Sequence, residues 1–543
     1  MRVFVRWAVP LLVAAASGCS REEPVPSPSR KEVPVVAPIG LVAELEVPEP
    51  RRVWASLRKL GGERAALLPS SFELGLFALL DLPPRVAGYL RPDTPIVGVA
   101  LLPPGAAATA VVGVRTMRGA ELVKELASGT DAPFRAERDG SPVTLLVGSA
   151  GSSVLGIVDD WLLIGREANA LRASGVYLAR GLGARRPRAE PITVRIEGPA
   201  LAGPISAGLR ERWATLRADL ADKDRAARAL HGRAPDFADP AALLGLADGV
   251  VASTLQLSAS IEHATLTLEP DADHVELRLS IAPRKDGALA RFTQALAVGP
   301  LAPLLELPSD VLFAVLSRSS DAERAAAAET PADAVRSVLG PRLPEKDAAP
   351  LAEALRSFHR GRGDVTAFGL LADGSAFLRQ TVREPKELDR GLRGLVRLLS
   401  VPALAEPLEP VLGKMTAPPS ATRVAGLEGL VQRAELTRQG AEKTEVLTYV
   451  RGASASTVVA PRAGDVLVAL ERPTRTLAAA SALRTLVQDR VPSSLVLYAN
   501  MPSAASAAAP ALALLGKDAQ NATIELVLSA PACAALLERF GTP

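Results

Sequence analysis

The second half of this chain repeats segments of its first half in the same order, and this repetition constrains the fold more than any other feature of the sequence. The segment LVAELEV begins at Leu41, and its counterpart VLFAVLS begins 270 positions later at Val311. Further pairs follow in order: VGVALL with FGLLAD, MRGAEL with REPKEL, VDDWLLIGRE with RAGDVLVALE, and VELRLSIAPRKDGALARF with IELVLSAPACAALLERF. We therefore predict two related structural units, residues 39–300 and 308–543.

Each unit is predicted to combine short strands with helices. Residues 39–47 have the apolar and β-branched content of a strand, and residues 53–60 have the apolar spacing of a helix. Two more strands, 94–102 and 109–117, are separated by a Pro-Pro-Gly turn, and short strands continue through 143–165. The predicted fold class is therefore α+β, with two tandem copies of a unit of antiparallel strands and covering helices.

The two predicted units differ in length at two places. Pro199 pairs with Pro502 at an offset of 303, whereas Val275 pairs with Ile524 at 249, so the first unit contains 303 − 249 = 54 additional residues. The second unit has an insertion of its own, residues 400–423, which is rich in proline and is predicted to be a loop. Because a shared scaffold does not require these segments, they are candidates for function.

Residues 206–230, within the additional segment of the first unit, are predicted to form a helix with one apolar stripe. Leu209, Trp213, Leu216 and Leu220 follow one another at steps of four, three and four residues. Either this stripe packs on the sheet of the first unit, or the helix projects and offers the stripe to a partner or to a second copy of the chain. In the second case, charged neighbours would select the partner, namely Arg210, Arg212, Arg217, Asp219, Asp222, Lys223 and Asp224.

The composition limits the classes of partner. The 543 residues are 48% hydrophobic, too many for a single core, so two or more domains are expected. The 62 basic and 59 acidic residues are interspersed, whereas a nucleic-acid-binding protein would carry a basic face, so no nucleic-acid partner is expected. Aromatic residues make up 3% of the chain and leave little material for stacking bases or sugars.

Motifs of the common catalytic centres are absent or incomplete. Ser56-Leu57-Arg58-Lys59 and Tyr498-Ala499-Asn500 resemble two boxes of penicillin-binding enzymes, but Lys443-Thr444-Glu445 lacks the glycine of the third box and precedes the second. The sequence contains no nucleophile elbow and no phosphate-binding or dinucleotide-binding glycine loop. Asp271-Ala272-Asp273-His274 is interpreted as a turn and Arg362-Gly363-Asp364 as a loop. We therefore predict a protein that is not an enzyme and uses no metal and no cofactor.

The first 18 residues have the pattern of an export signal. Arg2 and Arg6 precede an apolar run that is too short to span a membrane, and Ala16-Ser17-Gly18 stands directly before Cys19. This arrangement resembles a bacterial lipoprotein signal, and the resemblance implies that Cys19 becomes the lipid-bearing N-terminus. The competing interpretation is a plain secretory signal that is cut after the Ala14–Ala16 run. Both interpretations place the mature protein outside the cytoplasm.

Residues 19–38 are predicted to be a lipid anchor followed by a proline-rich tether. Five prolines in positions 20–38 favour an extended chain, which would reach on the order of 60 Å. Ser20 and Arg21 follow Cys19 where an aspartate would mark inner-membrane retention, so the resemblance favours the outer membrane, facing the periplasm or the surface. With Cys19 acylated, Cys533 has no partner for a disulfide.

These features predict a lipoprotein of the cell envelope that acts as a non-enzymatic binding or scaffolding module. Its repeated sheet and helix segments are similar to duplicated exported bacterial domains of unknown function. The membrane would be contacted through the N-terminal lipid, and a protein partner or self-association is expected. The alternative is a periplasmic carrier of lipid or another apolar ligand, held between curved sheets and their covering helices.

Overall fold

A computed structural model gives the fold of most of the chain beyond its N-terminal segment. The described residues are 35–60, 69–75, 88–91, 93–103, 107–128, 132–148, 154–186, 190–231, 240–329, 345–398, 400–401, 405, 414–437, 443–488, 490–501 and 508–540. The predicted signal, Cys19 and most of the predicted tether lie outside these residues. No described helix is long and apolar enough to cross a membrane.

The predicted fold class, two tandem copies of an α+β unit, is wrong. The described strands belong to one open antiparallel sheet of 20 strands. The chain divides into two compact units that are interleaved in sequence, since the first comprises residues 1–205, 261–282 and 527–543 and the second comprises 206–260 and 283–526. Sequence periodicity showed which segments are strands, but it carries no information on how many strands one sheet collects.

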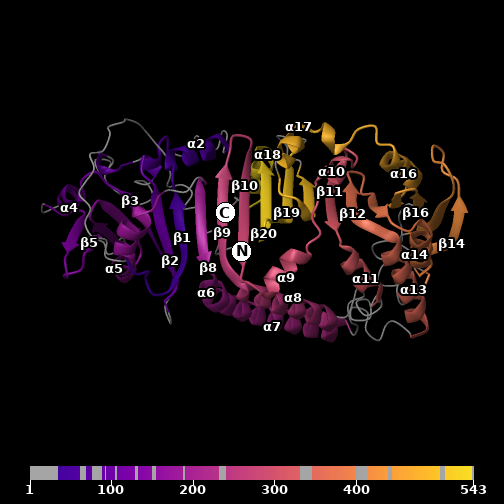
Figure 1. The fold of residues 1–543 in the computed structure, drawn as a ribbon, viewed down its shortest axis with the longest axis horizontal. Coiled ribbons are helices and arrows are strands. Elements are labelled where there is room, and N and C mark those ends of the chain that lie inside the picture. Colours follow the sequence, from indigo (N-terminus) through magenta and orange to yellow (C-terminus); the bar gives the residue numbers. More distant parts are fainter. Residues whose placement is uncertain are drawn as a thin grey trace. The chain divides into compact units, whose positions relative to one another are not determined.

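The first unit is rich in short strands. Leu41–Val47 (β1) precedes the helix Pro50–Leu60 (α2), as predicted for residues 39–47 and 53–60. Its further elements, drawn from indigo to magenta in Figure 1 apart from the yellow α18, are β2 (Ile96–Leu101), β3 (Thr109–Arg115), α4 (Gly119–Ala127), β4 (Phe134–Glu137), β5 (Thr144–Gly148), β6 (Val154–Val158), β7 (Trp161–Gly165), α5 (Ala168–Val176), η3 (Tyr177–Gly181), η4 (Leu182–Ala184), β8 (Ile192–Glu197), α6 (Gly198–Ala200), η5 (Leu201–Ile205), β9 (Ile261–Pro270), β10 (His274–Pro283) and α18 (Ala530–Phe540).

The second unit begins with a pair of long helices, α7 (Ser206–His231) and α8 (Pro240–Ala259), which pack on each other. Its further elements are α9 (Ala288–Ala295), α10 (Ala302–Leu305), β11 (Val311–Arg318), α11 (Asp321–Glu329), α13 (Glu345–Gly361), β12 (Arg362–Leu371), β13 (Ala376–Val382), α14 (Pro385–Leu398), β14 (Lys414–Thr422), β15 (Val431–Thr437), β16 (Lys443–Arg451), β17 (Ser454–Ala460), α16 (Ala463–Glu471), η7 (Leu477–Ala479), α17 (Ser481–Val487), β18 (Ser493–Asn500), β19 (Pro510–Asp518) and β20 (Asn521–Ser529).

The order of strand pairing recurs along the sequence. β1 lies between β2 and β8, and β3 pairs with both β2 and β7. In the same way β11 lies between β12 and β18, and β13 pairs with both β12 and β17. The registers correspond as well, because Leu41 pairs with Leu101 and Val311 with Leu371, each followed by an irregularity two residues on. Within these strands an offset of 270 therefore identifies corresponding positions. The repeat boundaries 39–300 and 308–543 stay a prediction.

Two expectations for the second half are wrong. The match of VDDWLLIGRE with RAGDVLVALE sets residues 466–470 against the strand at 161–165, but these residues lie in the helix α16. A short continuous apolar run fits both a buried strand and a buried helix, so the pattern VLVAL was ambiguous. The end of the predicted proline-rich loop, residues 414–422, forms β14. Among the described strands it pairs with β15 alone, and such an edge strand tolerates two prolines.

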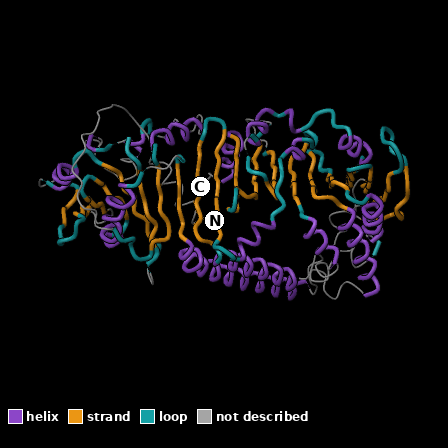
Figure 2. Tube along the Cα trace, in the orientation of Figure 1, coloured by secondary structure: helices purple, strands orange, loops and turns teal. Residues whose placement is uncertain are grey.

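The core of the second unit includes a tightly packed helix pair. Figure 2 shows α13 and α14 lying beside each other, and Leu351, Leu395 and Leu398 pack between them. Gly391 on α14 permits this approach, since a Cβ atom there would lie 2.4 Å from the backbone nitrogen of Phe358 on α13. This packing holds the start of β12, which follows α13 directly, in a fixed place.

Candidate functional site

The predicted apolar stripe lies on α7 and is only partly covered. Leu209, Leu216 and Leu220 are 41%, 49% and 40% exposed, and Trp213 is half-buried. The neighbouring helix α8 adds Val250, which is also exposed. Large apolar side chains gathered along one helix in this way are typical of a surface that contacts another molecule. The role of these residues in partner binding stays a prediction.

Asp248 on α8 ties α7 to its neighbour. The indole nitrogen of Trp213 donates a hydrogen bond of 2.8 Å to the Asp248 carboxylate, and the guanidinium of Arg217 lies 3.0 Å from the same group. Ser206 and Ser258 add a hydroxyl–hydroxyl bond of 2.9 Å. These contacts use the flank of α7 that carries Arg217, so the opposite flank, with Arg212 and Asp219, faces away from α8.

An open hollow of about 390 Å³ lies between the two helices. It is mostly apolar, with one charged pair at its wall, and is lined by Trp213, Ala214, Arg217, Ala218, Ala221, Leu244 and Asp248. The predicted carrier would enclose its ligand between curved sheets and helices. This hollow instead lies between two helices, so it fits that arrangement poorly.

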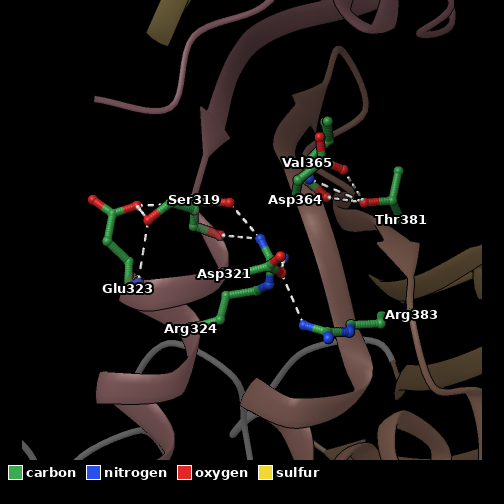
Figure 3. Close-up of polar contacts among 9 residues, drawn as sticks. Ser319, Asp321, Glu323, Arg324, Asp364, Val365, Thr381 and Arg383 are labelled. Carbon is green, nitrogen blue, oxygen red and sulfur yellow. Dashed lines mark hydrogen bonds and ion pairs between the residues drawn. The ribbon is translucent and has the colours of Figure 1, made fainter. Parts of the chain in front are cut away.

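A second candidate site lies in the second unit, where β11 ends and α11 begins (Figure 3). The Arg324 guanidinium donates to the carbonyl of Ser319 and to the carboxylate of Asp321. Arg383, just after β13, reaches the same Asp321 at 2.8 Å. One carboxylate therefore serves two guanidinium groups.

The other acids around this site are already bound within the chain. Glu323 accepts hydrogen bonds from the backbone nitrogen of Ser320 at 2.7 Å and from its hydroxyl at 3.1 Å, while that hydroxyl accepts from the Glu323 nitrogen at 3.2 Å. This reciprocal arrangement is a capping box at the start of α11. The Asp364 carboxylate accepts from the Thr381 hydroxyl at 3.2 Å, as Figure 3 shows.

Arg362, at the start of β12, completes the cluster of positive charge. Its guanidinium is half-buried, and its Nε atom has no hydrogen-bond partner among the described residues. Burial lowers the pKa of Arg362 first, and the nearby positive charge of Arg324 lowers it further, against the opposing effect of Glu323. The neighbouring His359 has its pKa lowered from 6.5 by burial and then by Arg362.

A third polar cluster lies in the first unit. The Tyr177 hydroxyl donates to the Glu44 carboxylate, and Arg185 contacts both groups at 2.8 Å and 3.2 Å. Burial, then Glu44, raises the pKa of Tyr177 to about 12, so this phenol stays protonated at neutral pH. A phenol in that state is a poor nucleophile, and the cluster is interpreted as a structural contact.

The remaining sequence candidates have ordinary structural roles in the described residues. Asp271 closes a tight turn, with its backbone nitrogen donating to the carbonyl of His274 at 2.9 Å, as predicted. Arg362-Gly363-Asp364 begins β12 and is not a loop, which corrects that interpretation. Burial raises the pKa of Cys533 to about 11, so its thiol is unreactive at neutral pH. The described residues contain no group of three or more possible metal ligands.

No family model, curated protein or solved structure matches this chain. The function is therefore inferred from the residues of this chain. Sequence reasoning identified the stripe on α7 but missed the arginine cluster. A signal for it was present, because the match of MRGAEL with REPKEL sets Met117 against Arg383.

Proposed function

We propose that this protein is a non-enzymatic scaffolding module of the cell envelope that pairs with a second copy of itself through α7. It would be exported by its first 18 residues and held at the outer membrane by lipid on Cys19. A fatty-acid label that enters the parent protein but not Cys19→Ala would support the anchor. The observation that carries the proposal is the exposed stripe of Leu209, Leu216 and Leu220.

The stripe is self-complementary when two copies of α7 run antiparallel. An axis between Ala214 and Thr215 places Leu209 opposite Leu220 of the second copy, and Trp213 opposite Leu216, since each pair of numbers has the same sum. Flanking positions of an antiparallel helix pair are offset by two residues from the apolar positions, so on the free flank Arg212 faces Asp219 of the second copy. Asp219 also contacts Lys223 at 2.7 Å, but an exposed pair of this kind holds its partner only weakly.

The pairing is expected to be weak in free solution. Covering the exposed half of each leucine would stabilise the pair by about 1 kcal/mol per side chain, which is small against the cost of association. Anchoring on a membrane raises the effective concentration of the helices and would favour the pair. A scaffold assembled in this way would depend on its lipid as well as on its stripe.

Sedimentation equilibrium of the full chain in mild detergent tests the pairing. Leu216→Lys places a charge at the centre of the stripe and should abolish the dimer. Thr215→Lys, on the far face of the same helix, is the matched control and should leave it intact. A parent protein that stays monomeric up to roughly millimolar concentration, the range that tethering supplies, contradicts the proposal.

A charge exchange tests the antiparallel register. Arg212→Asp should weaken the dimer because two acids then face each other across the axis, and adding Asp219→Arg should restore it. Failure of the double variant to recover would rule out this register.

A second candidate is the binding of a small apolar ligand in the hollow beside Trp213. The apolar wall formed by Ala214, Ala218, Ala221 and Leu244 favours it. Native mass spectrometry after gentle purification would show retained ligand as added mass. A mass equal to that of the bare chain would argue against the carrier.

A further inference from the structure

The arginine cluster of the second unit is assembled from three separate segments by backbone hydrogen bonds. The nitrogen of Ser319 donates to the carbonyl of Asp364 at 2.9 Å, which joins the end of β11 to β12. The nitrogen of Arg383 donates to the carbonyl of Gly361 at 2.9 Å, and Arg362 is paired with Val382 across the sheet. These bonds bring the backbones of the Arg324, Arg362 and Arg383 segments to one place.

The cluster carries more positive than negative charge. Arg318, Arg324, Arg362 and Arg383 supply four positive charges, and the acids among them are Asp321, Glu323 and Asp364. Asp321 is shared by two arginines, and Glu323 is engaged by the start of α11. Among the described residues, no carboxylate lies within ion-pair distance of Arg362.

Packing alone does not account for these arginines. The Arg324 side chain is only 8% exposed, and a buried guanidinium loses its hydration. At the corresponding positions of the first half, by offsets of 270 and 266, stand Trp54 and Met117. The same strand pairing therefore forms with apolar side chains at these two positions and does not require Arg324 or Arg383.

We propose that this cluster, Arg324, Arg362 and Arg383, is a binding site for the phosphate group of a small molecule. A guanidinium presents paired donors that match the oxygens of phosphate or carboxylate. A phosphate group offers more acceptor oxygens than a carboxylate, so it can engage donors that approach from three segments. The bound anion would neutralise the excess charge and give Arg362 the partner that the described residues do not supply.

Isothermal titration calorimetry of the full chain, at constant ionic strength, tests the site with inorganic phosphate and with glycerol 3-phosphate. Binding of either probe should fall by roughly tenfold or more in Arg362→Met, since a charged donor is lost. Arg390→Met is the matched control, because Arg390 is an exposed arginine of α14 that pairs with Glu387 at 2.7 Å. Its binding should equal that of the parent.

Asp321→Asn tests the same site in the opposite direction. This substitution removes the carboxylate that Arg324 and Arg383 share, so phosphate should bind more tightly than to the parent. A purely structural cluster would give no such gain, and this variant keeps the test valid if Arg362→Met does not fold. Absence of phosphate binding by the parent, equal weakening by Arg390→Met, or unchanged binding by Asp321→Asn would each overturn the proposal.

Discussion

Trp54 on α2 and Arg324 on α11 occupy corresponding positions, 270 residues apart, and both side chains are buried. Trp54 is 2% exposed and packs in an apolar cluster with Val53, Phe72 and Leu90. Arg324 is surrounded by the Ser319 carbonyl and by charged side chains. The apolar cluster around Trp54 is called the first corner here, and the charged cluster around Arg324 the second corner. Both occur with the same order of strand pairing, because backbone hydrogen bonds join the strands whichever side chains cover them.

Corresponding positions that differ in charge between the two halves are candidates for function. A buried tryptophan stabilises its own unit through burial of apolar area. A buried arginine beside a second arginine gives little stability, since the desolvation of both charges opposes folding. The same strand pairing forms without the charge of Arg324. A ligand therefore explains the charged second corner better than packing does.

The largest expected effect comes from placing the charge of the second corner into the first. Trp54→Arg should destabilise the first unit by at least about 3–5 kcal/mol, because it removes a core aromatic and buries a cation without an acid. Urea denaturation followed by circular dichroism measures the loss. Trp54→Phe, which keeps an aromatic ring, should lose much less. Equal stability of Trp54→Arg and the parent would show that the first corner is not an apolar core.

A smaller effect is expected from substitutions at the N-terminal ends of α11 and α2, the helices of the two corners. Ser320 and Glu323 form a capping box on α11, whereas α2 starts at Pro50 and has no acid in its first turn. Ser320→Ala should therefore cost about 1 kcal/mol, measured by the same denaturation. The control is Glu49→Ala before α2, where only an exposed ion pair with Arg52 is lost and a change of a few tenths of a kcal/mol is expected. Similar losses for both variants would remove this distinction.

The smallest expected effect is a pH dependence that belongs to the second corner. The pKa of His359 is lowered in the folded state, so below pH 6.5 the unfolded chain takes up this proton more readily than the folded chain. The stability that the neutral His359 contributes is therefore fully present above pH 6.5. It should be lost as the pH drops from 6.5 through the lowered pKa.

Thermal melts of the parent and of His359→Gln between neutral pH and mildly acidic pH measure this difference. The parent should lose slightly more stability than the variant. Arg362→Met should reduce the loss, because Arg362 is the second cause of the lowered pKa, after burial. If His359→Gln shows the same acid loss as the parent, the titrating group is elsewhere.

Local sequence patterns predicted several elements close to their observed positions. Residues 39–47 and 53–60 contain β1 and most of α2, and residues 206–230 correspond to α7. These elements follow from side-chain periodicity over neighbouring residues, which is a local property. The prolines of β14 and the continuous apolar run of α16 misled the same reasoning, because partner strands and burial decided those two segments.

The sequence by itself determined that α7 would be a helix with Leu209, Leu216 and Leu220 on one side, since a period of 3.6 residues places them there. It also determined the order in which related segments recur. Only the tertiary structure decided that the strands join one sheet, that the stripe stays partly exposed, and that Arg362 lies near Arg324 with no carboxylate of the described residues within ion-pair distance. Those outcomes depend on contacts between residues far apart in the chain, which neighbouring residues do not encode.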